Sequence, residues 1–244
     1  MCIRPKCSPN IRSDTLAQNT STYTSNGELL TLQESMGECS RMLLSDPSVT
    51  GSKRRLVLAS SSPRRHELIK ALDLRIRIQV PVSTEGPPLH HETPEKYTLR
   101  LALAKAREIA PQNPDSIILG ADTIVMLGNE IIGKPTNKHE AIRMLSRLRG
   151  RKHKVVTSIV VVDGASGDWS SATKITEVTL RKYSNTEMSH YVKSGSPLDK
   201  AGSYAIQDRM FNPAENVVGC YLNVIGLPIC EAFILLKRAG MSIN

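Results

Sequence analysis

The residues Ser60-Ser61-Ser62-Pro63-Arg64-Arg65 place three hydroxyls and two guanidiniums at one point of the chain. An apolar segment, residues 56–59, reads as a buried strand before them, and a helix is expected to begin at Pro63 with Ser62 as its N-cap. The dipole of a helix disfavours cations in its first turn, so two arginines there indicate that an anion binds. Arginine is suited to bidentate contact with phosphate. The alternative is a capped helix with solvated arginines.

A second candidate is Asp122, which lies inside the apolar segment 117–126. A buried carboxylate without a partner costs several kcal/mol or stays protonated. Asp122 is therefore expected to have a cation partner, to bind a metal, or to lie at the rim of a cleft. The alternative is a structural acid that accepts hydrogen bonds from backbone N–H groups.

Lys134 is predicted to lie beside this carboxylate, because Gly128-Asn129 is a hairpin signal. A two-residue turn pairs Leu127 with Glu130 and places Lys134 one residue out of register with Asp122, on the opposite face. A three-residue turn with a bulge places both side chains on one face. The sequence leaves this choice open.

Other candidates are weaker when each is taken alone. Glu85 begins a polar loop after a predicted strand, and Lys105 lies in a predicted helix; either one is more often a solvated surface group. The loop 199–208 combines small residues with Lys200, Tyr204 and Gln207. That mixture is typical of a loop that contacts a ligand.

The elements that must position these residues alternate between strands and helices, which indicates an α/β protein with a mixed sheet. Capping-box patterns at Asn137 and Ser184 mark two of the helix starts. Strands are expected at 56–59, 75–82, 117–126, 130–133, 153–162, 172–183 and 221–225, and helices at 63–72, 93–110, 137–150, 184–195 and 229–239.

Composition and charge divide the chain in two. Hydrophobic residues make up 40% of the 244, too many for a disordered chain, and no apolar run approaches the roughly 18 residues of a membrane span. Residues 1–52 contain four basic and five acidic side chains, whereas the remaining 28 basic and 18 acidic side chains give residues 53–244 a net charge of +10. The surplus indicates an anionic partner such as nucleic acid, nucleotide or acidic membrane.

We interpret residues 1–52 as a flexible Ser/Thr-rich extension and residues 53–244 as one domain. A short helix at 28–44 and an organellar transit peptide are both compatible with the extension.

Six ordered segments resemble the Maf-like nucleoside triphosphate pyrophosphatases over residues 54–240. The resemblance implies an elongated α/β fold with a mixed twisted sheet, flanking helices and two lobes around a deep cleft. It also implies hydrolysis of a nucleoside triphosphate to the monophosphate and pyrophosphate with a divalent metal, Mg²⁺ or Mn²⁺, and it is strongest for the dTTP/UTP branch. The segments are Leu58–Arg65, Lys105-Ala106, Gly120-Ala-Asp-Thr123, Gly133-Lys-Pro135, Asp199–Gln207 and Gly226-Leu-Pro228.

The resemblance also implies roles for individual residues. Asp122 matches the proton acceptor, with a metal-binding role as the alternative, and Glu85 is expected to bind the metal. Ala205 and Asp208 depart from the family's usual glycines and leave the base preference open, modified pyrimidine nucleotides included. The expected catalytic residues are Asp122, Lys134 and Glu85; the metal ligands are Glu85 and Asp122; the substrate-binding residues are Ser60, Arg64, Arg65, Lys105, Thr123, Lys200 and Gln207.

The expected partner is a nucleoside triphosphate, without nucleic acid or membrane, in a cytoplasmic protein for which a homodimer is compatible with the sequence. The alternative is a nucleic-acid-binding or cell-division regulatory module that uses the same basic cleft. Only 4% of the residues are aromatic, which leaves few platforms on which single-stranded bases could stack.

Overall fold

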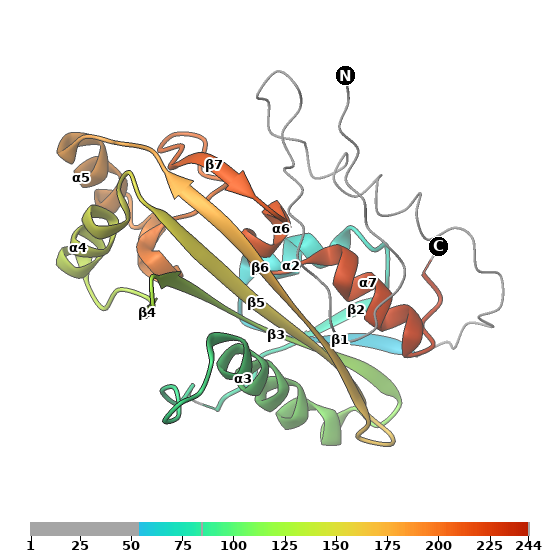
Figure 1. Cartoon of the computed structure of the whole chain (residues 1–244). Coiled ribbons are helices and arrows are strands. Elements are labelled where there is room, and N and C mark those ends of the chain that lie inside the picture. Colours follow the sequence, from blue (N-terminus) through green and yellow to red (C-terminus); the bar gives the residue numbers. More distant parts are fainter. Residues whose placement is uncertain (1–53, 84, 244) are drawn as a thin grey trace.

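The computed structural model describes residues 54–83 and 85–243 (Figure 1). The predicted extension and its helix at 28–44 lie outside the described residues. The strands are β1 (Arg55–Ala59), β2 (Ile76–Gln79), β3 (Ser116–Leu127), β4 (Glu130–Ile132), β5 (Lys152–Asp163), β6 (Trp169–Leu180) and β7 (Ala214–Val218). The helices are α2 (Pro63–Lys70), α3 (Pro94–Ile109), α4 (Lys138–Leu148), α5 (Asn185–Lys193), α6 (Tyr221–Ile225) and α7 (Ile229–Arg238), with 3₁₀ turns η1 (Ala110–Gln112), η2 (Ser196–Asp199) and η3 (Ala201–Ser203).

All of these strands belong to one mixed sheet, as the sequence predicted. The strand order is β2-β1-β3-β5-β6-β7, with β4 paired to β3 beside this path. β1 runs parallel to β2 and to β3, whereas β3, β5, β6 and β7 pair in antiparallel fashion. No helix among the described residues is long and apolar enough to cross a membrane.

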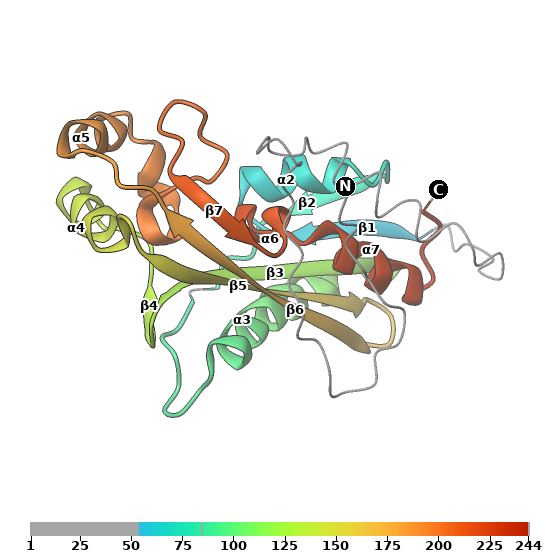
Figure 2. The same ribbon diagram turned by 45° about the horizontal axis from the view of Figure 1, so that its top comes forward.

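Helices cover both faces of the sheet (Figures 1 and 2). α3 lies on one face, α2, α6 and α7 lie on the other, and α4 and α5 lie at one end of the long strands. Because side chains alternate along a strand, Val57 and Ile118 pack under α3, whereas Leu56 and Ile117 belong to the opposite core. α3 approaches the sheet closely at Gly120, where a Cβ atom would lie 2.3 Å from the carbonyl oxygen of Ala102.

One edge of β3 is interrupted, and this determines where a site can form. β5 pairs with one edge of β3 from Ile117 to Met126. On the opposite edge, β1 pairs only as far as Gly120 and β4 pairs only from Val125 onward. No described strand pairs with residues 121–124 on that edge. We call these four residues the open edge of β3.

Two elements of the prediction are wrong. Residues 221–225, predicted as a strand, form helix α6, and strand β7 lies in a stretch that was predicted as a loop. The apolar pattern of a five-residue segment does not distinguish a strand from a helical turn. Tertiary contacts decide it: Asn223 is buried and donates to Val155 O (3.1 Å) and to Thr176 Oγ1 (2.8 Å). The sequence did not predict β7 because it lacks an alternating apolar pattern: Val217 is its only fully buried residue.

The predicted turn and helix starts are largely confirmed. Leu127 pairs with Glu130 across Gly128-Asn129, so the hairpin has the two-residue turn, and Gly128 has a φ of +61°. Ser184 forms a complete capping box. Asn137 also caps its helix through the backbone N–H of Glu140, but the Glu140 carboxylate accepts from Thr136 instead of completing the box.

Candidate functional site

The open edge of β3 carries Asp122 and Thr123, two of the predicted site residues. Successive side chains of a strand point to opposite faces of the sheet, so these two side chains point away from each other. Asp122 contacts α3 through Lys105, and Thr123 contacts α2 through Arg65. The candidate site therefore has two sides, which meet at the open edge.

On the α3 side, one lysine joins two carboxylates. Lys105 Nζ donates to Asp122 Oδ1 at 2.6 Å and to Glu85 Oε1 at 2.5 Å. The Asp122 side chain is 7% exposed and that of Glu85 is 44% exposed. The expected cation partner of Asp122 is therefore Lys105. α3 holds this lysine in position, and Thr93 caps the start of the helix by accepting from the backbone N–H of Lys96.

Burial and charge act differently on the two carboxyl groups. Burial raises the pKa of Asp122, and the positive charges of Lys105 and Arg65 offset only part of that effect. Burial also raises the pKa of Glu85, but the hydrogen bond and charge of Lys105, with the charges of Lys134 and Arg65, bring it below its usual value. Two neighbouring carboxyl groups with pKa values shifted in opposite directions are typical of sites that move protons.

On the α2 side, Arg65 is a buried cation. Its Nε donates to Gly226 O at 2.8 Å, one terminal nitrogen donates to Thr123 Oγ1 at 3.0 Å and the other to Ser60 Oγ at 3.4 Å. Burial lowers the pKa of Arg65, although arginine remains charged at any physiological pH. Within the described part of the chain, Arg65 forms no ion pair with a carboxylate. A buried cation with only neutral acceptors favours the binding of an anion.

Arg64 points elsewhere, although it is adjacent in sequence. Its Nη1 donates to Asp199 Oδ2 at 3.1 Å, and Lys200 Nζ donates to Asp199 Oδ1 at 2.5 Å. Lys200 Nζ also donates to the carbonyl oxygen of Ser196. Two predicted substrate-binding cations therefore share one carboxylate. Asp199 was not among the predicted site residues, although it stood beside Lys200 in the loop that the sequence singled out.

Lys134 and Gln207 are less closely connected to the other site residues. Lys134 is exposed and lies two residues beyond the end of β4, and its charge lowers the pKa of Glu85. Gly133 O accepts from the backbone N–H of Gly202 at 3.0 Å, which links this segment to the turn after Lys200. Gln207 is exposed. Its place in the site stays a prediction, as does the cleft between two lobes.

The donor chemistry of Glu85 and Asp122 fits a divalent metal. Mg²⁺ and Mn²⁺ prefer oxygen ligands, and Mg²⁺ is usually bound by one or two carboxylates together with substrate phosphates. Among the described residues, no group of three or more His, Cys, Asp or Glu side chains could hold a metal ion by itself. The two carboxylates would therefore need oxygens from a phosphate-bearing substrate to complete the coordination.

The fold is a mixed α/β sheet, and the site has a buried cation on one side of an open strand edge and a carboxylate pair on the other. These features define the class as proteins that bind a polyanion beside acidic groups. The comparison with family models is more specific: residues 55–239 match the model of the Maf-like proteins. The chain belongs to this family.

Curated relatives match over most of their length. A dTTP/UTP pyrophosphatase of Dehalococcoides mccartyi (strain CBDB1) is 40% identical over 193 residues, which cover 79% of this chain and 86% of that protein. The dTTP/UTP pyrophosphatase of Anaeromyxobacter dehalogenans (strain 2CP-1) is 45% identical, covering 76% of this chain and 94% of that protein. Among solved structures, a HAM1 protein from Coxiella burnetii is 17% identical with a TM-score of 0.38, covering 53% of this chain and 74% of that one.

Proposed function

We propose that this chain hydrolyses pyrimidine nucleoside triphosphates of the dTTP and UTP type to the monophosphate and pyrophosphate. Water attacks the α-phosphorus, the bond from that phosphorus to the bridging oxygen breaks, and pyrophosphate leaves. The observation that carries the proposal is that Arg65, a buried cation with no carboxylate partner among the described residues, lies on one side of the open edge and the Lys105-bridged carboxylates lie on the other. Membership in the Maf-like family and the names of the relatives support the reaction.

In this proposal Asp122 accepts the proton of the attacking water. Burial raises its pKa, which makes its carboxylate a stronger base than an exposed aspartate once it is ionised. Lys105 holds the carboxylate at 2.6 Å and fixes its direction. Glu85 is held by the same ammonium and is the group that we assign to the metal.

The cations of the site compensate the charge that develops on the leaving group. Arg65 lies beside the open edge, where it donates to Thr123. Arg64 lies in the first turn of α2, and Lys134 and Lys200 lie in loops. Phosphoryl transfer depends mainly on positioning and on stabilisation of negative charge, which preorganised cations provide.

We propose Mg²⁺ or Mn²⁺ as the cofactor, bound by Glu85, with Asp122 as the alternative ligand, and by phosphate oxygens. When bound, such a metal polarises the phosphoryl oxygens and neutralises part of the substrate charge.

Pyrophosphate release from a panel of nucleoside triphosphates, with Mg²⁺ and Mn²⁺ in separate series, tests the proposed function. We expect the highest kcat/KM for dTTP or UTP. The panel also includes 5-substituted pyrimidine nucleotides, because modified pyrimidine nucleotides are candidate substrates. The absence of pyrophosphate release from every nucleotide would contradict the proposal. Nucleic-acid affinity that falls steeply with salt, without any turnover, would favour the alternative of a binding module.

A further inference from the structure

We propose that Asp199 is a resident counter-ion of the site, which holds Arg64 and Lys200 in the ligand-free protein and is displaced from both when a polyphosphate binds. The inference rests on the proposed function, because that function assigns a polyphosphate ligand to these two cations. It adds Asp199 as a residue that sets the affinity for that ligand.

Asp199 contacts the two cations through different oxygens. Its two carboxylate oxygens are used separately, Oδ2 by Arg64 at 3.1 Å and Oδ1 by Lys200 at 2.5 Å. Arg64 lies in the first turn of α2 and Asp199 ends η2, 135 residues later in the chain. One carboxylate therefore neutralises two cations that reach it from different parts of the fold.

The exposure of the three side chains shows why a ligand can replace Asp199 as the partner of the two cations. Lys200 is 12% exposed and Arg64 is 25% exposed, whereas Asp199 is 59% exposed. The cations thus need a counter-ion near them, but the carboxylate is free to turn into solvent. An ion pair with one solvated member is weaker than a fully buried one, so a ligand can break it readily.

Polyphosphate is a better partner for the same donors. Its oxygens carry more negative charge than one carboxylate and accept several charge-assisted hydrogen bonds at once. Burial raises the pKa of the Asp199 carboxyl group, but the hydrogen bonds and charges of Lys200 and Arg64 bring it below its usual value. Asp199 therefore stays ionised at neutral pH and competes with the ligand. After displacement its charge remains close to the bound phosphates and weakens their binding, which favours release of pyrophosphate.

Calorimetric titration of inorganic pyrophosphate into the full-length protein tests this. We expect Asp199→Asn to bind pyrophosphate about three- to tenfold more tightly than the wild type, because two competing ion pairs are removed. The matched control is Glu67→Gln, which removes one exposed carboxylate from α2, where Glu67 pairs with Lys70 at 2.7 Å. This control should bind pyrophosphate as the wild type does. Asp199→Ser repeats the test with a different neutral side chain.

Steady-state kinetics separates this role from a merely structural one. A lower KM for the nucleotide in Asp199→Asn supports displacement, since a disturbed fold would raise KM or reduce kcat alone. Unchanged or weaker pyrophosphate binding in both neutral variants would overturn the proposal. Because pyrophosphate binding is measured without turnover, an inactive wild type would contradict the proposed function while leaving this test intact.

Discussion

At the scale of single residues, the chemistry depends on how each charge is partnered. Lys105 contacts two carboxylates, Asp199 contacts two cations, and the acceptors of Arg65 among the described residues are all neutral. These three arrangements leave one buried cation ready for an anion and one buried carboxylate ready for a proton. The proposed hydrolysis, which has an anionic leaving group, uses both of them.

Asp122→Asn tests the role of the buried carboxylate. We expect kcat to fall by about 100-fold or more, since a general base contributes 10²–10⁴. The unfolding temperature should change little, because asparagine keeps the shape of the side chain and removes a negative charge that burial disfavours. Normal turnover in this variant would exclude Asp122 as the base.

The wild-type pH profile provides an independent check of the same residue. The base works only when it is unprotonated, so activity is lost as the pH falls through the raised pKa of Asp122. The acid limb of kcat/KM should therefore lie above the usual aspartate value of about 4.

At the scale of elements, the interruption along β3 determines the site. β1 ends opposite Gly120 and β4 ends opposite Val125, so no described strand pairs with this edge over the four residues between them. The chain leaving β1 enters α2 at this point and supplies Arg64 and Arg65, while α3 supplies Lys105 from the opposite face. A strand paired along the whole of this edge of β3 would cover the open edge.

Gly120→Ala tests whether α3 must lie this close to the sheet. A Cβ atom at residue 120 would lie 2.3 Å from the carbonyl oxygen of Ala102, a backbone atom of α3, so the helix must shift. We expect a loss of about 1–3 kcal/mol in unfolding free energy, as for other overpacked cores. Activity should fall as well, because a shift of α3 moves Lys105 away from Asp122. Gly86→Ala is the control, since nothing lies within 4 Å of a Cβ there.

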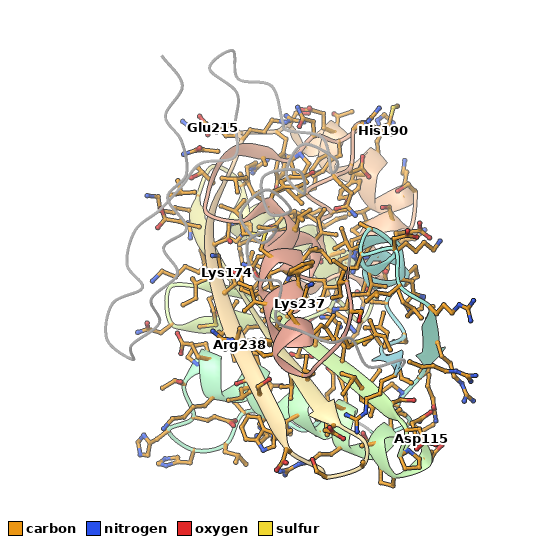
Figure 3. All side chains as sticks on the ribbon, turned by 90° about the vertical axis from the view of Figure 1, so that its right-hand side faces the viewer. Asp115, Lys174, His190, Glu215, Lys237 and Arg238 are labelled. Carbon is orange, nitrogen blue, oxygen red and sulfur yellow. The ribbon has the colours of Figure 1, made fainter. Side chains whose placement is uncertain are left out.

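At the scale of the whole molecule, much of the basic surplus has local structural partners. Arg147 pairs with Glu130, Arg149 donates to Tyr183 O and to Asn185 Oδ1, and Lys152 pairs with Glu177. Figure 3 shows Lys237 and Arg238 on α7 and Lys174 on the neighbouring β6, on the face away from α3. Among the described residues, we therefore assign the proposed site to the cations around the open edge and not to the net charge as a whole.

Stability is expected to depend on pH through His153, which anchors the loop after η3 to β5. His153 is 2% exposed, its Nε2 lies 2.7 Å from the Tyr204 hydroxyl, and burial lowers its pKa to about 4. The unfolded state therefore binds the proton more readily than the folded state between about pH 6.5 and 4. This contribution is complete above pH 6.5 and is lost as the pH falls, by about 3 kcal/mol at pH 4.

Urea unfolding between pH 4 and 7 measures this contribution. His153→Gln keeps a polar group for Tyr204 but cannot titrate, so its stability should vary less with pH than that of the wild type. His139→Gln, at an exposed position of α4, is the matched control and should retain the wild-type slope. Equal slopes in the wild type and His153→Gln would rule out His153 as the source.

Deletion of residues 1–52 tests the proposed domain boundary. The family match begins at residue 55, so we expect the shortened chain to keep its kcat/KM. A large loss of kcat would show that the extension takes part in turnover.

The sequence by itself determined the α/β class, most of the elements, the hairpin at Gly128-Asn129 and the expectation that Asp122 has a cation partner, binds a metal or lies at the rim of a cleft. These follow from local periodicity, turn chemistry and the cost of burying a charge, which depend on neighbours in the chain. The family motifs also contain Asp122 and Thr123 of the open edge and the residues Lys105 and Arg65 that contact them.

Only the tertiary structure decided which charges meet. Lys105, 17 residues before Asp122, is its partner, and Arg64 and Arg65 diverge to Asp199 and to Gly226, 135 and 161 residues away. Other long-range contacts, those of Asn223 with Val155 and Thr176, accompany the helix at 221–225, and the extent of β1 and β4 pairing leaves the edge of β3 open. Side-chain direction and strand pairing determine which of these charges come into contact. Both arise from packing between segments that lie far apart in the sequence.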